Sequence, residues 1–260
     1  MRRNSLFWGS VLILLAALFL LKALRIIDDV WGYFWLLAVG FLGVWFILRA
    51  FWHPKSAEGE RVTIEQKGAQ QASLHINHGA GRLEIGAGVE PGMLLTGNFD
   101  SGLDYKTEMV GDKLEVTMRA TSGFGPFIGE GFDWRIKLAR DIPLSLAINT
   151  GASEARLDLS ELRVSYLKLE TGASSTVLTM PAASGSMLAE INAGVASVEI
   201  HVPEGVAARI RIKEGLSARS INSARFTRLE SNIYQSPDYD TAANRVDLNI
   251  ETGVGSISVL

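Results

Sequence analysis

Apolar and polar residues alternate along most of the chain after residue 60, and each alternating stretch is broken near its middle by a glycine. Alternation with a period of two is typical of a half-buried β-strand. Each stretch therefore predicts two strands joined at a glycine turn. The six turn glycines are Gly79, Gly151, Gly172, Gly194, Gly215 and Gly253.

Successive glycines from Gly151 to Gly215 are 21 or 22 residues apart. A fixed period of this size is typical of repeat architectures, in which each unit buries its apolar face against its neighbours. The unit is too short for a strand–helix–strand crossover of roughly 30 residues. We therefore predict stacked β-rungs, a β-solenoid or β-roll, over residues 61–260. At each turn we expect either a positive φ or a close approach of two backbones, both of which favour glycine. The small Ala and Ser beside it fit a tight corner.

The regular pattern is interrupted in two places. A hairpin is predicted between Leu103 and Arg119, with Gly111 and Asp112 at its turn. The spacing between Gly215 and Gly253 is stretched to 38 residues, and residues 219–244 are interpreted as an inserted loop or a cap.

The first fifty residues follow another pattern. Two runs without charge, Leu6–Leu21 and Val30–Leu48, are each near the roughly 20 apolar residues that a membrane-spanning helix needs. We predict a transmembrane hairpin over residues 1–52, with helices at about 6–27 and 30–52, and a polar linker at 53–60. A cleaved signal peptide and a pair of buried soluble helices are the alternatives. Both are disfavoured because the first run is too long for a signal peptide and a second run follows at once.

Several side chains fit the ends of these helices. Trp8, Trp31 and Trp52 are predicted interfacial anchors, and Lys22 can extend its charge to the interface. The count of Lys and Arg favours both chain ends inside by a small margin. This predicts an inner-membrane protein with two spans, in contact with the lipid bilayer, and a β-domain on the cytoplasmic side.

Composition narrows the function. The net charge is −3 without a basic stripe, so nucleic acid is not an expected partner. The chain has no cysteine, which excludes disulfides, thiolate metal sites and cysteine catalysis. His75 and His78 are three residues apart on a predicted strand, so they point to opposite faces and do not favour a metal site.

The loop from Ser122 to Gly131 is rich in glycine but lacks the Gly-Lys-Ser/Thr ending of a phosphate loop. Its apolar residues Phe124, Phe127 and Ile128 either cover the end of the β-core or contact a partner or the membrane, and we favour the first alternative. Asp158, Glu161 and Glu170 are scattered carboxylates, and the serines repeat with every turn. No catalytic residue, cofactor or metal is predicted.

Several segments resemble a known family. They are Trp134–Leu138, Asp141–Leu144, the Thr-Gly-Ala-Ser turns, Leu157–Ser160 and the closing Asn249–Val259. Together they are similar to the β-rich toastrack domain of LiaF-like proteins, and the first fifty residues resemble the LiaI/LiaF-type transmembrane region. The resemblance implies an accessory regulator of bacterial cell-envelope stress signalling that restrains a membrane sensor histidine kinase.

The leading hypothesis is thus a non-enzymatic membrane protein that acts by contact with a sensor kinase. The alternative is an extracytoplasmic, adhesin-like module that binds envelope polymer. A third is a carbohydrate-active enzyme, which requires two carboxylates that meet in a groove. The sequence does not specify an oligomeric state.

Overall fold

The computed structural model describes residues 59–100, 102–120 and 133–260. Every regular element in this part of the chain is a β-strand. The strands are β1 (Glu60–Glu65), β2 (Gln71–Ala87), β3 (Met93–Phe99), β4 (Leu103–Val110), β5 (Lys113–Ala120), β6 (Trp134–Leu138), β7 (Leu144–Asp158), β8 (Val164–Thr179), β9 (Ser186–His201), β10 (Ala207–Ile221), β11 (Thr227–Glu230), β12 (Ile233–Gln235) and β13 (Arg245–Val259).

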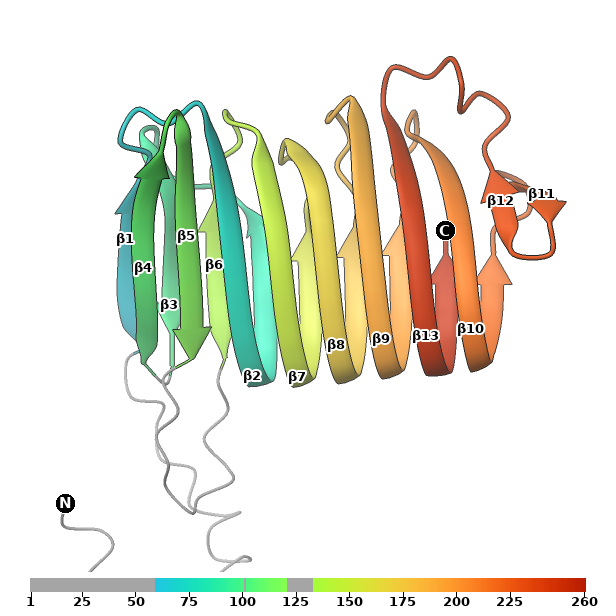
Figure 1. Cartoon of the computed structure of the whole chain (residues 1–260), viewed down its shortest axis with the longest axis horizontal. Helices are drawn as coiled ribbons and strands as arrows, with labels where there is room; N and C mark the ends of the chain where they lie inside the picture. Colours follow the sequence, from blue (N-terminus) through green and yellow to red (C-terminus); the bar gives the residue numbers. More distant parts are fainter. Residues whose placement is uncertain (1–58, 101, 121–132) are drawn as a thin grey trace, which may run out of the picture. The chain divides into compact units, whose positions relative to one another are not determined.

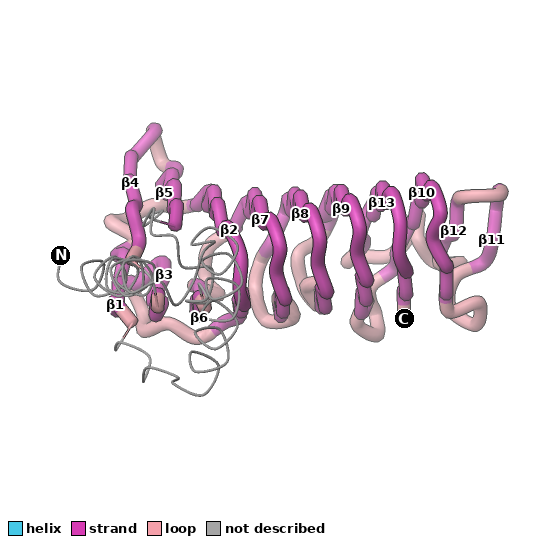
Figure 2. The backbone as a smooth tube through the Cα atoms, turned by 90° about the horizontal axis from the view of Figure 1, so that it is seen from below, coloured by secondary structure: helices cyan, strands magenta, loops and turns pink. Residues whose placement is uncertain are grey.

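The six long strands are bent in the middle, and their bends form one edge of the domain (Figures 1 and 2). The first half of β2 pairs with β5, while its second half pairs with β6. The first halves of the long strands therefore form one layer and the second halves form the other. Ladder pairing continues on both sides of each glycine, so each predicted strand–turn–strand unit is one continuous bent strand.

The long strands pair in parallel, in the order β2-β7-β8-β9-β13-β10. The last copy of the repeat in the sequence, β13, thus lies between β9 and β10 and not beyond β10. A fixed period does not determine this order, because all copies carry the same alternating pattern and can pair with one another. The strands β7, β8 and β9 therefore stack in sequence order, as in a simple solenoid, but the next strand beside β9 is β13 and not β10.

The core lies between the two layers and consists of the alternating apolar residues of both halves. On β2, Leu74 and Ile76 of the first half and Leu83 of the second half are fully buried. Trp134 is also fully buried, with its ring 5.1 Å from that of Phe99 in an edge-on arrangement. Apolar and polar residues therefore alternate because successive side chains of each strand point into the core and out to the surface, as the prediction assumed.

The two ends of the domain are built differently. At one end β1, β3 and β6 extend the second-half layer, and the antiparallel hairpin β4–β5 extends the first-half layer. Gly111, at the turn of this hairpin, has a φ of 65°. At the other end β12 pairs antiparallel with the first half of β10, and β11 pairs with β12. This short pair covers one edge of the sheet, and residues 236–244 then lead back to β13.

Residues 59–100, 102–120 and 133–260 contain no helix that is long and apolar enough to cross a membrane. The predicted hairpin over residues 1–52, with Trp8, Lys22, Trp31 and Trp52, lies outside the described residues. The loop residues Phe124, Phe127 and Ile128 also lie outside them.

Candidate functional site

The six repeat glycines lie on neighbouring strands along the bend edge. A Cβ added to Gly151 would stand 2.5 Å from the carbonyl oxygen of Gly79, and one added to Gly172 would stand 3.0 Å from that of Gly151. The same relationship continues through Gly194, Gly253 and Gly215, with distances of 2.8, 2.7 and 2.5 Å. None of the six has a positive φ. Of the two expected reasons for glycine, close backbone approach therefore applies and positive φ does not.

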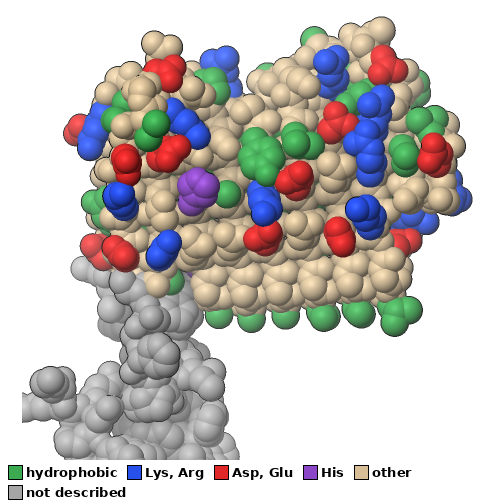
Figure 3. Space-filling view, viewed as in Figure 1, with side chains coloured by type: hydrophobic (Ala, Val, Ile, Leu, Met, Phe, Trp, Pro, Cys, Tyr) green, Lys and Arg blue, Asp and Glu red, His purple; other side chains and the backbone are tan. Residues whose placement is uncertain are grey.

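The residue after each of these glycines is apolar and exposed. In strand order these residues are Ala80, Ala152, Ala173, Val195, Val254 and Leu216, and they are in register along the ladder. Val195 is 60% exposed and Leu216 is 82% exposed. We call this row the bend ridge; it forms the lower edge of the surface in Figure 3. The expectation that the small residue beside the glycine packs into a corner is wrong for this position.

The outer face of the first halves carries polar side chains in rows that cross the strands. We call it the first-half face, and it is the face seen in Figure 3. The row nearest the bend is Asn77, Asn149, Glu170, Asn192, Glu251 and Lys213. A shallow groove follows this row between the polar side chains and the glycines. Within the row, Asn149 Nδ2 donates a hydrogen bond to Asn77 Oδ1 over 3.1 Å.

An aromatic and an aliphatic side chain lie together near the middle of this face. Tyr166 on β8 and Leu188 on β9 are direct cross-strand partners, and Leu188 is 36% exposed. The Tyr166 hydroxyl donates a hydrogen bond to Glu190 Oε2 over 2.8 Å. This bond, with burial, raises the pKa of Tyr166. Lys168 Nζ pairs with Glu170 Oε1 at 2.7 Å, and that contact raises the pKa of Lys168. We call Tyr166 and Leu188 the Tyr166 patch.

A second polar cluster joins the segment before β13 to the sheet. The Tyr239 hydroxyl donates a hydrogen bond to Asp247 Oδ2, and Arg211 Nη1 pairs with Asp247 Oδ1 at 3.1 Å. The Arg209 guanidinium lies 4.2 Å above the centre of the Tyr239 ring. Burial, followed by the hydrogen bond to Asp247, raises the pKa of Tyr239 to about 12. Tyr239 is almost fully buried, so this cluster anchors the returning chain.

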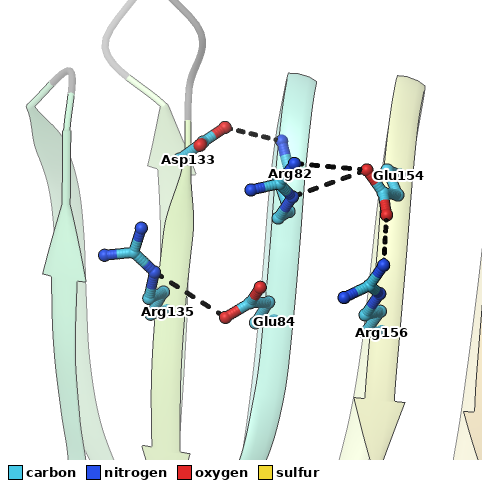
Figure 4. A network of polar contacts seen from close by, with 6 residues as sticks. All are labelled: Arg82, Glu84, Asp133, Arg135, Glu154 and Arg156. Carbon is cyan, nitrogen blue, oxygen red and sulfur yellow. Dashed lines mark hydrogen bonds and ion pairs between the residues drawn. The ribbon is translucent and has the colours of Figure 1, made fainter.

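The outer face of the second halves carries a set of ion pairs over β6, β2 and β7 (Figure 4). Glu154 accepts from Arg82 at 3.5 Å and from Arg156 at 2.8 Å, and Arg135 lies 3.7 Å from Glu84. The backbone N–H of Arg82 donates to Asp133 Oδ1 over 3.0 Å. These charges are balanced and partly exposed, so each pair contributes little to stability.

Two glutamates of the groove bear on the hypothesis of a carbohydrate-active enzyme, which requires two carboxylates that meet in a groove. Glu170 and Glu251 both line the groove, but β9 with Asn192 lies between them. Two strand spacings place their backbones about 9–10 Å apart. Glu170 is also engaged by Lys168. Asp158 accepts hydrogen bonds from Ser160, and Glu161 pairs with Arg140, so these two stabilise a turn and a surface contact.

The two histidines lie on opposite sides of β2, as their spacing predicted. His75 is exposed, whereas His78 is 3% exposed and packs 5.2 Å from the Trp134 ring. Across residues 59–100, 102–120 and 133–260, no group of three His, Asp or Glu side chains is placed to hold a metal ion.

Sequence reasoning identified the glycines but missed the bend ridge and the Tyr166 patch. The ridge had a usable signal, because the residue after the glycine is apolar in all six copies. The Tyr166 patch had a weaker signal in the sequence. It depends on knowing that Tyr166 and Leu188 are cross-strand partners, which requires the register of β8 against β9.

The family model that matches residues 53–201 is the N-terminal domain of toast_rack, DUF2154. The match covers the chain from before β1 to the end of β9. The chain belongs to the toast_rack family. This confirms the toastrack part of the resemblance and an all-β domain of toast-rack type, while β10 to β13 follow beyond the matched residues.

One solved structure is similar over most of this toast_rack chain. It is a crystal structure from Clostridium sporogenes, named as that of a "putative cell adhesion protein", with 25% sequence identity and a TM-score of 0.71. The similarity covers 78% of this chain and 98% of the other. Among curated proteins, no relative matches the chain.

Proposed function

We propose that this toast_rack protein is a non-enzymatic, adhesin-like binding module of the bacterial cell envelope. In this proposal the hairpin predicted over residues 1–52 anchors it in the membrane, and the β-domain lies outside the cytoplasm. The β-domain contacts an extended polymer or protein of the envelope. This is the alternative of the sequence hypotheses. It would require the small excess of Lys and Arg at the chain ends to be a misleading guide to topology.

The observation that carries the proposal is the structural similarity to the protein named for cell adhesion. That similarity includes nearly the whole of the other chain and 78% of this one, so it is not confined to one motif. Fold alone does not determine function, and the surface must also suit the task.

The first-half face suits contact with an extended partner. Its polar rows cross six parallel strands about 4.8 Å apart, so they present a regular array of donors and acceptors roughly 24 Å long. The Tyr166 patch adds an exposed apolar contact in the middle of the array, bordered by Lys168 and Glu190. A small apolar centre with a polar surround is the usual anatomy of a binding surface.

A second candidate function is the regulator of a membrane sensor kinase. The confirmed toast_rack family membership and the resemblance of the first fifty residues to the LiaI/LiaF-type region favour it. In this case the predicted hairpin packs against the spanning helices of the kinase, and the β-domain adds a second contact.

The side of the membrane separates the two candidates. The chain has no cysteine, so one cysteine at the exposed position Glu204, on the edge opposite the bend, gives a background-free probe. We expect a membrane-impermeant thiol reagent to label Glu204→Cys in intact cells. Labelling only after the cells are opened would overturn the adhesin-like proposal and favour the kinase regulator. A second variant with the cysteine at Ala183, on the same edge, should be labelled in the same way, which checks that the result does not depend on the position chosen.

A further inference from the structure

The bend ridge is a continuous row of exposed apolar side chains that do not pack into the core. Its six residues point outward at the bend and follow one another across neighbouring strands (Figure 3). Its side chains grow larger along the row, from three alanines to Val195, Val254 and Leu216. Val254 is 46% exposed, and Leu216 has the largest exposed fraction among the large apolar residues in the described part of the domain. At about 4.8 Å per strand, the ridge is roughly 24 Å long.

The rows on either side of the ridge mix uncharged polar side chains with charges of both signs. The nearest outward row on the first-half face begins with Asn77 and Asn149, and it contains two carboxylates and one lysine in six positions. The corresponding row on the other face is Arg82, Glu154, Ser175, Ser197, Ser256 and Ala218, so its charges are one ion pair at one end of the row. Figure 3 shows the uncharged band directly above the lower edge. An apolar crest flanked by polar rows with charges of both signs suits the interfacial region of a bilayer, where apolar side chains enter and polar and charged ones stay at the level of the headgroups.

The start of the described chain lies at the same edge. Glu60 pairs with Phe99, Phe99 pairs with Trp134, and Trp134 pairs with Leu83, which is only four residues beyond Gly79 on β2. The strand β1 therefore leaves from the bend edge. The predicted second span ends at residue 52, and the seven residues to Gly59 reach at most about 25 Å when fully extended.

We propose that the bend ridge rests on the lipid surface of the membrane that anchors the chain. The occupant of the ridge is thus the interfacial region of the bilayer. The short connection holds the bend edge close to the bilayer, and the exposed Val195, Val254 and Leu216 enter its interface. In this orientation the first-half face rises away from the membrane surface and remains accessible to a partner. The inference rests on the membrane anchor of the proposed function but does not depend on which partner binds.

The test uses the full chain reconstituted in lipid nanodiscs, with single cysteines that carry an environment-sensitive fluorophore. Ala152→Cys, Val195→Cys and Leu216→Cys place the fluorophore on the ridge, while Ala183→Cys and Glu204→Cys place it on the opposite edge. We expect emission at shorter wavelength for the ridge positions, and quenching by nitroxide-labelled lipids about threefold stronger than at the control positions. Replacing Val195 and Leu216 by serine should reduce the quenching of a fluorophore at Ala152.

Two results would overturn the inference. Ridge fluorophores that are as hydrated as the controls would show that lipid does not reach the ridge. Ridge fluorophores that are shielded but not quenched by nitroxide lipid would show that a protein, such as a second copy of the chain, covers it instead. Either result leaves the labelling of Glu204→Cys in cells unchanged, so failure of this inference is separable from failure of the proposed function.

Discussion

A Cβ on Gly194 would stand 2.8 Å from the carbonyl oxygen of Gly172 on the neighbouring strand. A contact this short with a backbone atom requires one strand to move away from the other. The same relationship links five of the six repeat glycines to a neighbour, so the close spacing at the bend depends on glycine at each of these positions.

We expect Gly194→Ala to lower the free energy of unfolding by about 1–3 kcal/mol, because the added methyl group overpacks the bend. Gly79 provides the matched control. A Cβ there meets no heavy atom within 4 Å, and its φ is not positive. Gly79→Ala should therefore be neutral or stabilising by about 0.5 kcal/mol. Equal destabilisation by both variants in thermal unfolding would contradict the role of close approach.

The buried Tyr239 hydroxyl predicts a pH dependence. Its pKa is raised from 10.0 to about 12, so the folded state holds the phenolic proton more tightly than the unfolded state. The stabilisation is complete below pH 10 and is lost as the pH rises from about 10 to 12, in total about 3 kcal/mol. Denaturant unfolding between pH 8 and 12 measures it. Tyr239→Phe should lose this part of the alkaline decline, and an unchanged decline would contradict the assignment.

The proposed function predicts that the Tyr166 patch contributes to binding. We expect Tyr166→Ala or Leu188→Ala to weaken retention on envelope material about tenfold or more, as for a central contact of an interface. Val177→Ala is the matched control, because Val177 is exposed to the same 36% as Leu188 but lies on the outer face of the second half of β8. If Val177→Ala weakened retention as much as Leu188→Ala, the contact would not lie on the first-half face.

The adjacent strands β13 and β10 provide two apolar residues whose replacement should have very different effects on stability. Ile250 on β13 is 2% exposed, whereas Leu216 on the adjacent β10 is 82% exposed. We expect Ile250→Ala to cost about 2–5 kcal/mol of unfolding free energy, because it leaves a cavity between the layers. Leu216→Ala should change it by less than about 0.5 kcal/mol. A large effect of Leu216→Ala in solution would show that the ridge is part of the core.

The strands and bends of the domain were predictable because the same alternating stretch with a central glycine recurs, and its alternation has a single physical cause, the burial of one face of each strand. The glycines also predicted where the chain turns, since few other residues allow backbones to approach so closely. The position of β13 was not predictable. Its alternating residues match those of β7, β8 and β9, so the pattern fits beside any of them. Contacts between residues far apart in the sequence, such as Arg211 with Asp247 and β12 with β10, accompany the final arrangement.

The candidate surfaces were less accessible to sequence reasoning. Rows such as Tyr166 and Leu188 exist only after the register of two strands is known. The bend ridge was hidden for another reason. An alanine after a glycine, as at Ala152 and Ala173, is equally consistent with a packed corner, and only the exposed fraction distinguishes the two.

The place of β13 in the sheet has a consequence for biosynthesis. β10 leaves the ribosome before β13, yet β9 and β10 each need β13 as their neighbour. The edge of β9 must therefore stay open until the later segment has been synthesised, while β1 to β9 can assemble during translation. A nascent chain that stalls between Ile221 and Arg245 lacks an inner strand and not an outer one. In such a chain, the parallel edge of β9 is exposed to any other strand in the cell.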